Sequence, residues 1–352
     1  MNPYLQMSNL ASRHTKMTYD KISEKHFGTC PFCHCTVDAF STDNKTSTFF
    51  CYACGSHGDK KEFLAKMNIR RNRTVIKGKD ALLLQIYEDA ACFYYEELVN
   101  EQNPGISYLK SRGFRMEEIQ EYGLGFAPDS FNALYKYLIK QYTNADLMRS
   151  GLFSISKKGY PYDFFRNRVV FPIMDENGDV IAFGGRVMDD SKPKYINSPE
   201  TEIFSKRNNL YGFPYDSEFG TSSIIICEGY MDYIAIHNAG FANCAATLGT
   251  AMTLEHAKLI KEQYDEVYLA MDSDGPGIYA MKKSIAILKT EGIKSYVLNF
   301  KPAKDPDEML RSKAMGLDAF RATIANALPA SHFLARNTEN ISEIVDILMQ
   351  QV

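Results

Sequence analysis

Acidic side chains follow three short apolar stretches of this sequence, and carboxylates in such an arrangement could hold divalent metal ions. The stretches read SIIIC (223–227), VYLA (267–270) and SYVLNF (295–300), and each has the composition of a strand buried on both faces. The acids that follow them, or lie one turn into the next helix, are Glu228, Asp232, Asp272, Asp274, Asp305 and Asp307.

Clustering of these carboxylates has an electrostatic cost. Asp272 and Asp274 share a face if strand geometry persists through them, and two charges about 4 Å apart repel by roughly 4 kcal/mol at an effective dielectric of 20. Either the acids splay into water or a cation neutralises them, and oxygen ligands favour Mg2+ or Mn2+. Two simpler interpretations stay open: Asp232 stabilises a helix N-terminus, and Asp305-Pro306-Asp307 forms a turn.

The cysteines indicate a second metal site near the N-terminus. Five of the eight lie between Cys30 and Cys54, and two C-x-x-C pairs, Cys30 with Cys33 and Cys51 with Cys54, are 17 residues apart. This spacing predicts a zinc ribbon with one structural, four-thiolate Zn2+. The open alternatives are disulfides, or a ligand exchanged for one of His34, Cys35 and His57.

The elements that must position the acids alternate along the chain. Each apolar stretch precedes a helical pattern (YMDYIAIHNAG, IYAMKKSIAIL), and a further strand in ANCAATLG and a helix in LEHAKLIKEQY separate the first two. This order is typical of a parallel α/β sheet, in which ligands bind beyond the carboxyl ends of the strands. The six acids are predicted to meet there.

The N-terminal half of the chain lacks this alternation of strands and helices. Between the cysteine pairs we expect a hairpin that turns near residues 43–45. Residues 82 to about 152 have helical spacing throughout, and DFFRNRVVFPIMDENGDVIAFGGRV predicts two strands joined by a turn at residues 176–179. The predicted class is multidomain α/β, with a β zinc ribbon, a mixed α+β basic subdomain, a parallel-sheet domain and a short helical C-terminus.

Charge is divided unevenly along the chain. The 352 residues carry a net charge of -3, yet residues 1–79 hold 13 basic and 6 acidic residues, a balance of +7 that leaves -10 for the rest. Residues 69–81 form a predicted cationic linker with Arg70, Arg71, Arg73, Lys77 and Lys79. The basic front favours contact with nucleic acid, although a merely solvated segment is the alternative. No apolar run suggests a membrane span or signal peptide, so we expect a cytoplasmic protein.

Beyond these single features, an ordered set of motifs resembles bacterial and phage DnaG-type primases, with their zinc ribbon and Toprim domain. The likeness extends to about residue 310 and rests on CPFC with CYACGSHGD, YLKSRGF, GLGFAPDS, RNRVVFPIMDENGDVIAFGGRV, PKYINSPETEIFSKRNNLYGF, CEGYMDYIAIHNAGF with ATLGT, MDSDGPG and KDPDEML. The corresponding predicted domains are residues 1–68 (zinc ribbon for template recognition), 69–81 (basic linker), 82–218 (N-terminal part of the core), 219–302 (Toprim) and 303–352 (DPD loop and helical end).

The resemblance implies that the chain makes short RNA primers on single-stranded DNA from ribonucleoside triphosphates. It implies catalytic roles for Glu228, Asp272 and Asp274, which with the other three acids hold two or more Mg2+ or Mn2+ ions. The family's basic residues, which contact template and nucleotide phosphates, map onto Arg166, Arg168, Arg186, Lys194, Asn197 and Lys206.

Two features depart from the family pattern. Many members have a histidine where this chain has Cys33, as some phage-type members do. Only 42 residues follow Leu310, so we expect no separate domain that binds the replicative helicase, and a compact monomer of phage or mobile-element type. The rival interpretations are a Toprim nuclease or topoisomerase, and a zinc-ribbon nucleic-acid binder without enzymatic activity.

Overall fold

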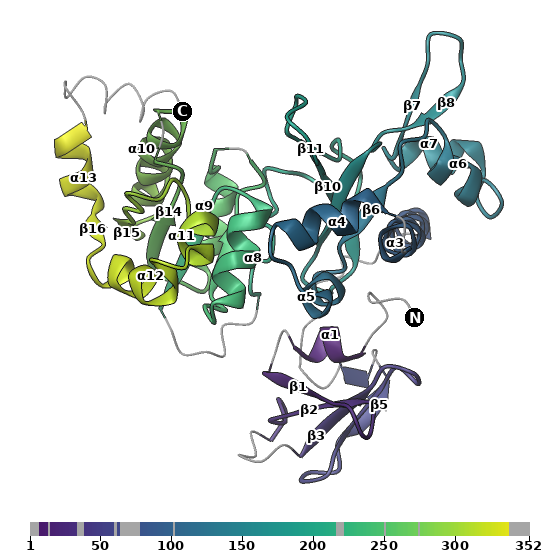
Figure 1. Cartoon of the computed structure of the whole chain (residues 1–352), viewed down its shortest axis with the longest axis horizontal. Coiled ribbons are helices and arrows are strands. Elements are labelled where there is room, and N and C mark those ends of the chain that lie inside the picture. The colour runs from purple at the N-terminus through teal and green to yellow at the C-terminus, as the bar shows by residue number, and fades with distance from the viewer. Residues whose placement is uncertain are drawn as a thin grey trace. The chain divides into compact units, whose positions relative to one another are not determined.

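The computed structural model describes residues 7–12, 15–33, 39–59, 62–63, 78–100, 103–215, 222–249, 251–273 and 275–337. Two units follow one another along the chain, residues 1–203 and 204–352, and Figure 1 colours them from purple to yellow. None of the helices in the described ranges is both long enough and apolar enough to cross a lipid bilayer. Of the predicted cationic linker, residues 69–77 lie outside the described residues.

A five-stranded antiparallel sheet forms the zinc-ribbon part of the first unit. Its strands follow chain order, and a short helix, α1 (Met7–Ala11), precedes them. The strands are β1 (Met17–Asp20), β2 (Lys25–Gly28), β3 (Phe40–Asp43), β4 (Thr48–Cys51) and β5 (His57–Asp59). The predicted hairpin is confirmed as β3 and β4, whereas β1, β2 and β5 are additional.

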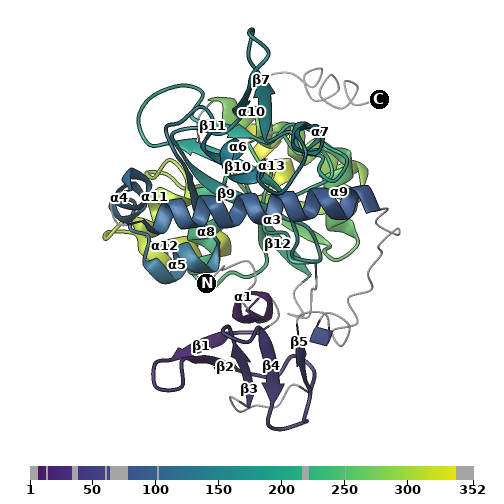
Figure 2. The same cartoon turned by 90° about the vertical axis from the view of Figure 1, so that its right-hand side faces the viewer.

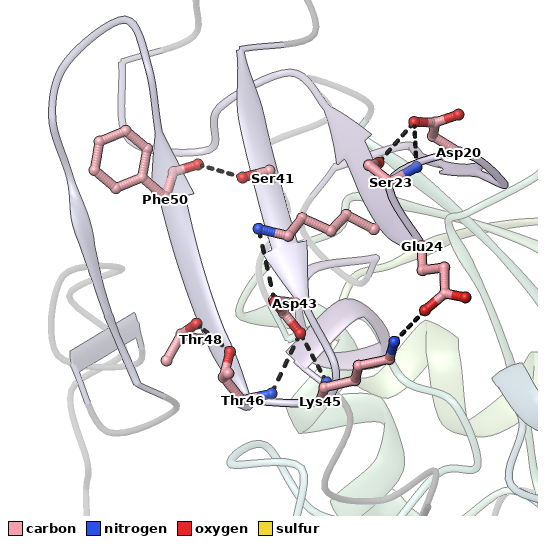
Figure 3. Close-up of polar contacts among 10 residues, drawn as sticks. Asp20, Ser23, Glu24, Ser41, Asp43, Lys45, Thr46, Thr48 and Phe50 are labelled. Carbon is pink, nitrogen blue, oxygen red and sulfur yellow. Dashed lines mark hydrogen bonds and ion pairs between the residues drawn. The ribbon is translucent and has the colours of Figure 1, made fainter.

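The turn between β3 and β4 is held by side-chain contacts (Figure 3). Oδ1 of Asp43 accepts hydrogen bonds from the backbone N–H groups of Lys45 at 2.8 Å and Thr46 at 3.2 Å. The Lys45 ammonium in turn pairs with Glu24, which belongs to the turn between β1 and β2. An Asx turn of this kind explains why the reversal occurs at residues 43–47, as the sequence indicates.

The core of the first unit is built on α3 (Gly78–Val99), which packs across β6 and β10 of a four-stranded antiparallel sheet (Figure 2). The sheet has the order β11-β10-β9-β6. Its strands are β6 (Gly125–Ala127), β9 (Arg168–Met174), β10 (Val180–Val187) and β11 (Tyr195–Asn197). The predicted pair of strands is confirmed as β9 and β10, with their turn at residues 175–179.

Shorter elements complete this unit. They are α4 (Pro104–Ser111), α5 (Met116–Glu121), α6 (Ala133–Leu138), α7 (Asn144–Arg149), β7 (Phe153–Ile155) and β8 (Pro161–Asp163). The expectation of helical structure throughout residues 82–152 was wrong at β6. At β6 the backbone forms a strand that lies close against α3. The approach is so close that a Cβ on Gly125 would lie 2.6 Å from Cβ of Tyr94.

The second unit contains the predicted parallel sheet, in the order β13-β12-β14-β15-β16. The strands are β12 (Ser223–Cys227), β13 (Cys244–Ala246), β14 (Glu266–Ala270), β15 (Lys294–Val297) and β16 (Leu328–Pro329). The first four run parallel, and β16 adds an antiparallel edge within the segment predicted to be a loop and helices. Because β12, β14 and β15 are adjacent, the residues that follow these strands emerge at one edge.

Helices of this unit connect and flank the strands. They are α8 (Tyr230–Asn238), α9 (Leu254–Lys261), α10 (Gly275–Thr290), α11 (Pro306–Arg311), α12 (Gly316–Ala325) and α13 (Ala330–Asn337). Ile224, Ile226, Val267 and Leu269 are completely buried between them. On the opposite face Ile225 is 4% exposed and Tyr268 is half-buried, so β12 is buried on both faces, as its uninterrupted apolar sequence indicates, and β14 less completely. The α/β multidomain class is confirmed.

Candidate functional site

Four cysteine sulfurs form one cluster in the zinc ribbon. Sγ of Cys30 lies 3.9 Å from Sγ of Cys54, and Sγ of Cys33 lies 3.9 Å from Sγ of Cys51. All four sulfurs lie within 4.8 Å of one another. A tetrahedral zinc with Zn–S bonds of about 2.3 Å separates its sulfurs by about 3.8 Å, so the cluster fits one Zn2+.

These contacts argue against disulfides and against His57 as a zinc ligand, the alternatives to a four-thiolate site that the structure can test. None of these four cysteines is in a disulfide, and 3.9 Å is far beyond the length of a disulfide bond, about 2.0 Å. Nδ1 of His57 lies 2.9 Å from the backbone oxygen of Gly55, so His57 takes part in the turn. His34 and Cys35 lie outside the described residues.

Burial makes the cysteine cluster dependent on a cation. Cys30 and Cys51 are completely buried, and desolvation raises the pKa of the Cys30 thiol. At the exposed rim, hydrogen bonds from Ser56 lower the pKa of Cys54 to about 6. Zinc binds thiolates, so the buried Cys30 sulfur ionises at neutral pH only with the ion in place.

The acidic side chains approach one another at the carboxyl edge of the parallel sheet. Glu228 directly follows β12, Asp272 follows β14 by two residues, and Asp232 lies in the first turn of α8. The backbone N–H of Asp272 donates to Oε1 of Glu228 at 3.1 Å, which ties the two strand ends together. Asp274 lies outside the described residues.

The DPD segment joins this group through α11. Asp305 is the N-cap of that helix, and its Oδ1 accepts from the backbone N–H of Glu308 at 2.8 Å. The backbone N–H of Asp307 donates to Oδ1 of Asp232 at 3.3 Å, so the helix start is held against α8. The alternative in which Asp305-Pro306-Asp307 forms a turn is therefore wrong, because the last two residues begin a helix, and the N-cap position also places Asp305 beside the other acids.

Like charges are crowded around Asp232. Burial raises the pKa of its carboxyl well above the usual range, and the neighbouring carboxylates of Asp305, Asp272 and Asp307 raise it further. Such a group ionises fully only when a cation is added, and an oxygen-only donor set suits Mg2+ or Mn2+. Among the described residues only the four cysteines place three or more ligand atoms within 4.8 Å of one another. The described carboxylates therefore do not enclose an ion site by themselves, and a bound Mg2+ or Mn2+ would take further ligands from water.

Comparisons with known proteins agree with this architecture. Three family profiles match consecutive parts of the chain: CHC2 zinc finger at residues 5–86, DNA primase catalytic core, N-terminal domain, at 93–216, and Toprim-like at 225–310. A DnaG primase catalytic domain solved bound to single-stranded DNA is 31% identical, with a TM-score of 0.66 over 74% of this chain and 84% of that one. The chain belongs to the DnaG-type primase family.

Two further relatives extend the match across the chain. The zinc-binding and RNA polymerase domains of Aquifex aeolicus primase align with 97% of it and 88% of their own length, at 29% identity and a TM-score of 0.69. The DNA primase of Clostridium acetobutylicum is 34% identical over 93% of this chain and 58% of its own length. The chain thus spans about three fifths of the curated primases that it matches.

Two of the basic residues predicted to contact phosphate are buried in this chain. The Arg168 guanidinium, on β9, donates to the backbone oxygens of Pro193 at 3.1 Å and of Gly185 and Lys194 at 3.3 Å. Arg186 donates to the Tyr195 hydroxyl at 3.0 Å and also lies 5.3 Å from the ring centre of Tyr108. These contacts give both arginines a structural role in the β10–β11 region, and their predicted phosphate contacts stay predictions.

The remaining basic positions are more accessible. The Arg166 guanidinium lies over the rings of Phe131 and Tyr162, 5.3 and 5.2 Å from their centres. Lys194 is exposed, and Asn197 is half-buried on β11. Lys206 belongs to the second unit, where its backbone oxygen accepts a hydrogen bond from Nε2 of His256 at 2.9 Å. Their phosphate-binding roles also stay predictions.

Residues that the sequence interpretation did not single out also contact the acids. Lys304 and Arg311 form ion pairs with the DPD segment and Asp272. Leu248, buried with φ of 61°, lies in a loop whose next residue, Gly249, donates its backbone N–H to the backbone oxygen of Glu228 at 3.0 Å. The sequence signal for Lys304 was its position directly before Asp305, and that for Leu248 was its place in the motif ATLGT.

Gly277 controls how closely α10 approaches the Asp272 loop. A Cβ at this position would lie 2.2 Å from the backbone oxygen of Asp272, whereas a Cβ on Gly275 would meet nothing within 4 Å. Gly277→Ala is therefore expected to lower the free energy of unfolding by about 1–3 kcal/mol, since the loop must move. Gly275→Ala, the matched control, should be neutral or slightly stabilising. Urea denaturation checks this, and equal midpoints for the two variants would contradict the close approach.

Proposed function

We propose that this chain is a DNA primase, which synthesises short RNA primers on single-stranded DNA from ribonucleoside triphosphates. The observation that carries the proposal is the meeting of carboxylates from neighbouring strand ends around Asp232, in a chain of the primase family. The proposal covers substrates as well as activity, because the chain spans only part of its curated relatives.

The acids are proposed to act through divalent ions. Glu228, Asp272 and Asp274 are the proposed catalytic ligands, and Asp232, Asp305 and Asp307 complete the set. When bound, Mg2+ or Mn2+ would activate the primer 3'-hydroxyl and neutralise the triphosphate as pyrophosphate leaves. The chain's own contribution is to orient the carboxylates: the Asp272 N–H holds Glu228, and Asp305 is fixed as a helix N-cap.

The nucleic acid is proposed to be held by other parts of the chain. Exposed Lys194 and half-buried Lys206 are suited to phosphate contacts, and Arg166 presents a guanidinium stacked on aromatic rings. The zinc ribbon is proposed to recognise the template. One family member solved with single-stranded DNA supports a single-stranded template for this chain as well.

The activity is tested by incubating zinc-loaded protein with single-stranded DNA oligonucleotides of varied sequence, four ribonucleotides and Mg2+. Short RNA that requires both template and ribonucleotides is the expected product on a denaturing gel. DNA binding without any product would favour the non-enzymatic zinc-ribbon interpretation. Cleavage of the oligonucleotides would favour a Toprim nuclease.

A further inference from the structure

A lysine ammonium lies between two carboxylates of the acidic group. Nζ of Lys304 is 3.3 Å from Oδ2 of Asp272 and 3.8 Å from Oδ2 of Asp305. Asp272 follows β14 and Asp305 caps α11, so the lysine connects two elements that are far apart in the sequence. It thereby places one positive charge where the acids repel one another.

Backbone contacts hold Lys304 at this place. Its backbone oxygen accepts from the N–H of Ser273 at 3.1 Å, directly beside Asp272. Its own N–H donates to Oε2 of Glu308 at 2.7 Å, within the first turn of α11. The ammonium is therefore presented to the two acids by a fixed loop, although about half of the side chain, 52%, is exposed.

The second ion pair of the group has a different character. Arg311 pairs with Asp307 one helical turn away. The Asp307 side chain is 5% exposed and the Arg311 side chain 29%, so the carboxylate of this pair, but not its guanidinium, is closed to solvent. Lys304 instead contacts carboxylates that are 22–23% exposed, on the side that an incoming ion could reach. The Lys304 ammonium lies on a flexible stem and contacts partly exposed carboxylates, so an ion can displace it, whereas an ion cannot easily reach the buried Asp307 carboxylate that Arg311 neutralises.

We propose that Lys304 is an intramolecular counter-ion: it holds Asp272 and Asp305 together before a divalent ion binds, and it gives way when the ion arrives. Lys304 is thus a positioning residue that competes with the metal for the same oxygens. This inference rests on the proposed function, in which these acids hold the divalent ions.

Removal of the Lys304 charge tests whether the lysine competes with the metal ion and whether it holds the two acids together. Lys304→Met keeps the length and most of the apolar stem, and should raise Mn2+ affinity by roughly three- to tenfold, since one competing charge is lost. Lys304→Arg keeps the charge and should leave the affinity close to that of the unaltered protein. Lys301→Met is the matched control, because Lys301 is exposed in the same loop and its described hydrogen bond is made by its backbone, to Asn299.

Mn2+ binding to zinc-loaded protein can be followed by electron paramagnetic resonance, without nucleotides or DNA. Thermal unfolding in buffer free of added divalent ions provides a second readout. There Lys304→Met should unfold at a lower temperature than Lys301→Met, and saturating Mn2+ should remove the difference.

The outcomes separate this inference from the proposed function. Equal Mn2+ affinity for Lys304→Met and Lys301→Met, or a difference in unfolding temperature that Mn2+ leaves unchanged, would overturn the counter-ion role alone. If Asp272→Asn does not weaken Mn2+ binding, the proposed metal site and the counter-ion role both fail. Tighter binding by Lys304→Met that is lost in the Lys304→Met, Asp272→Asn double variant supports both.

Discussion

Asp272→Asn is expected to reduce RNA primer synthesis at least about a thousandfold. A metal-bound site contributes several kcal/mol of charge stabilisation to the transition state, and each 1.36 kcal/mol corresponds to a tenfold change in rate. Asparagine keeps the size of the side chain and the backbone N–H that donates to Glu228, but it removes the negative charge. The measurement is the initial rate of primer synthesis at saturating Mg2+.

The control is Asp265→Asn, which makes the same chemical change at the other end of the same strand. Asp265 lies just before β14, and its carboxylate pairs with Lys261 at 3.0 Å. This exposed pair contributes little, so activity and stability should stay near those of the unaltered chain. Synthesis that survives in Asp272→Asn would remove Asp272 from the proposed metal ligands.

Loss of one zinc ligand is expected to abolish zinc binding and to unfold the zinc ribbon. Cys51→Ala should lose about one zinc per chain, because Cys51 is completely buried and its sulfur has no substitute among the described residues of the cluster. Structural zinc supplies about 10–16 kcal/mol of apparent binding energy in zinc-finger peptides, so the ribbon should lose its fold with the ion. Metal content by mass spectrometry and near-ultraviolet circular dichroism check both parts.

Two variants sharpen the zinc experiment. Cys92→Ala removes a thiol from α3, outside the cluster, and should retain the zinc. Cys33→His restores the ligand pattern of many family members, and three cysteines with one histidine also bind zinc, so it should retain about one ion per chain. Full zinc retention in Cys51→Ala would contradict the four-thiolate site.

The zinc site and the location of the acids could be predicted because both depend on local rules. A C-x-x-C pair bends the chain so that two sulfurs converge, and two such pairs at ribbon spacing need only one hairpin to meet. Likewise, apolar strands that alternate with helices must run parallel, so Glu228 and Asp272 had to emerge at the same edge. Neither conclusion required knowledge of distant contacts.

Other features were decided by tertiary contacts. β6 lies in a segment whose apolar spacing predicts a helix. That spacing does not reveal the close approach of α3 to Gly125, which occurs in the folded structure. Arg168 lies in a motif whose basic residues were predicted to bind phosphate. In the structure its guanidinium donates to three backbone oxygens of residues distant in the sequence. Burial of a charged group depends on partners that local sequence does not identify.

By itself, then, the sequence determined the kinds of ligand, the zinc-ribbon spacing and the sheet edge at which the acids gather. Only the tertiary structure decided which cations accompany those acids. The pairing of Lys304 with Asp272 joins residues from different loops, and that of Arg311 with Asp307 depends on how α11 begins. The physical reason is that periodicity and spacing act along the chain, whereas electrostatic neutralisation acts through space between segments that folding brings together.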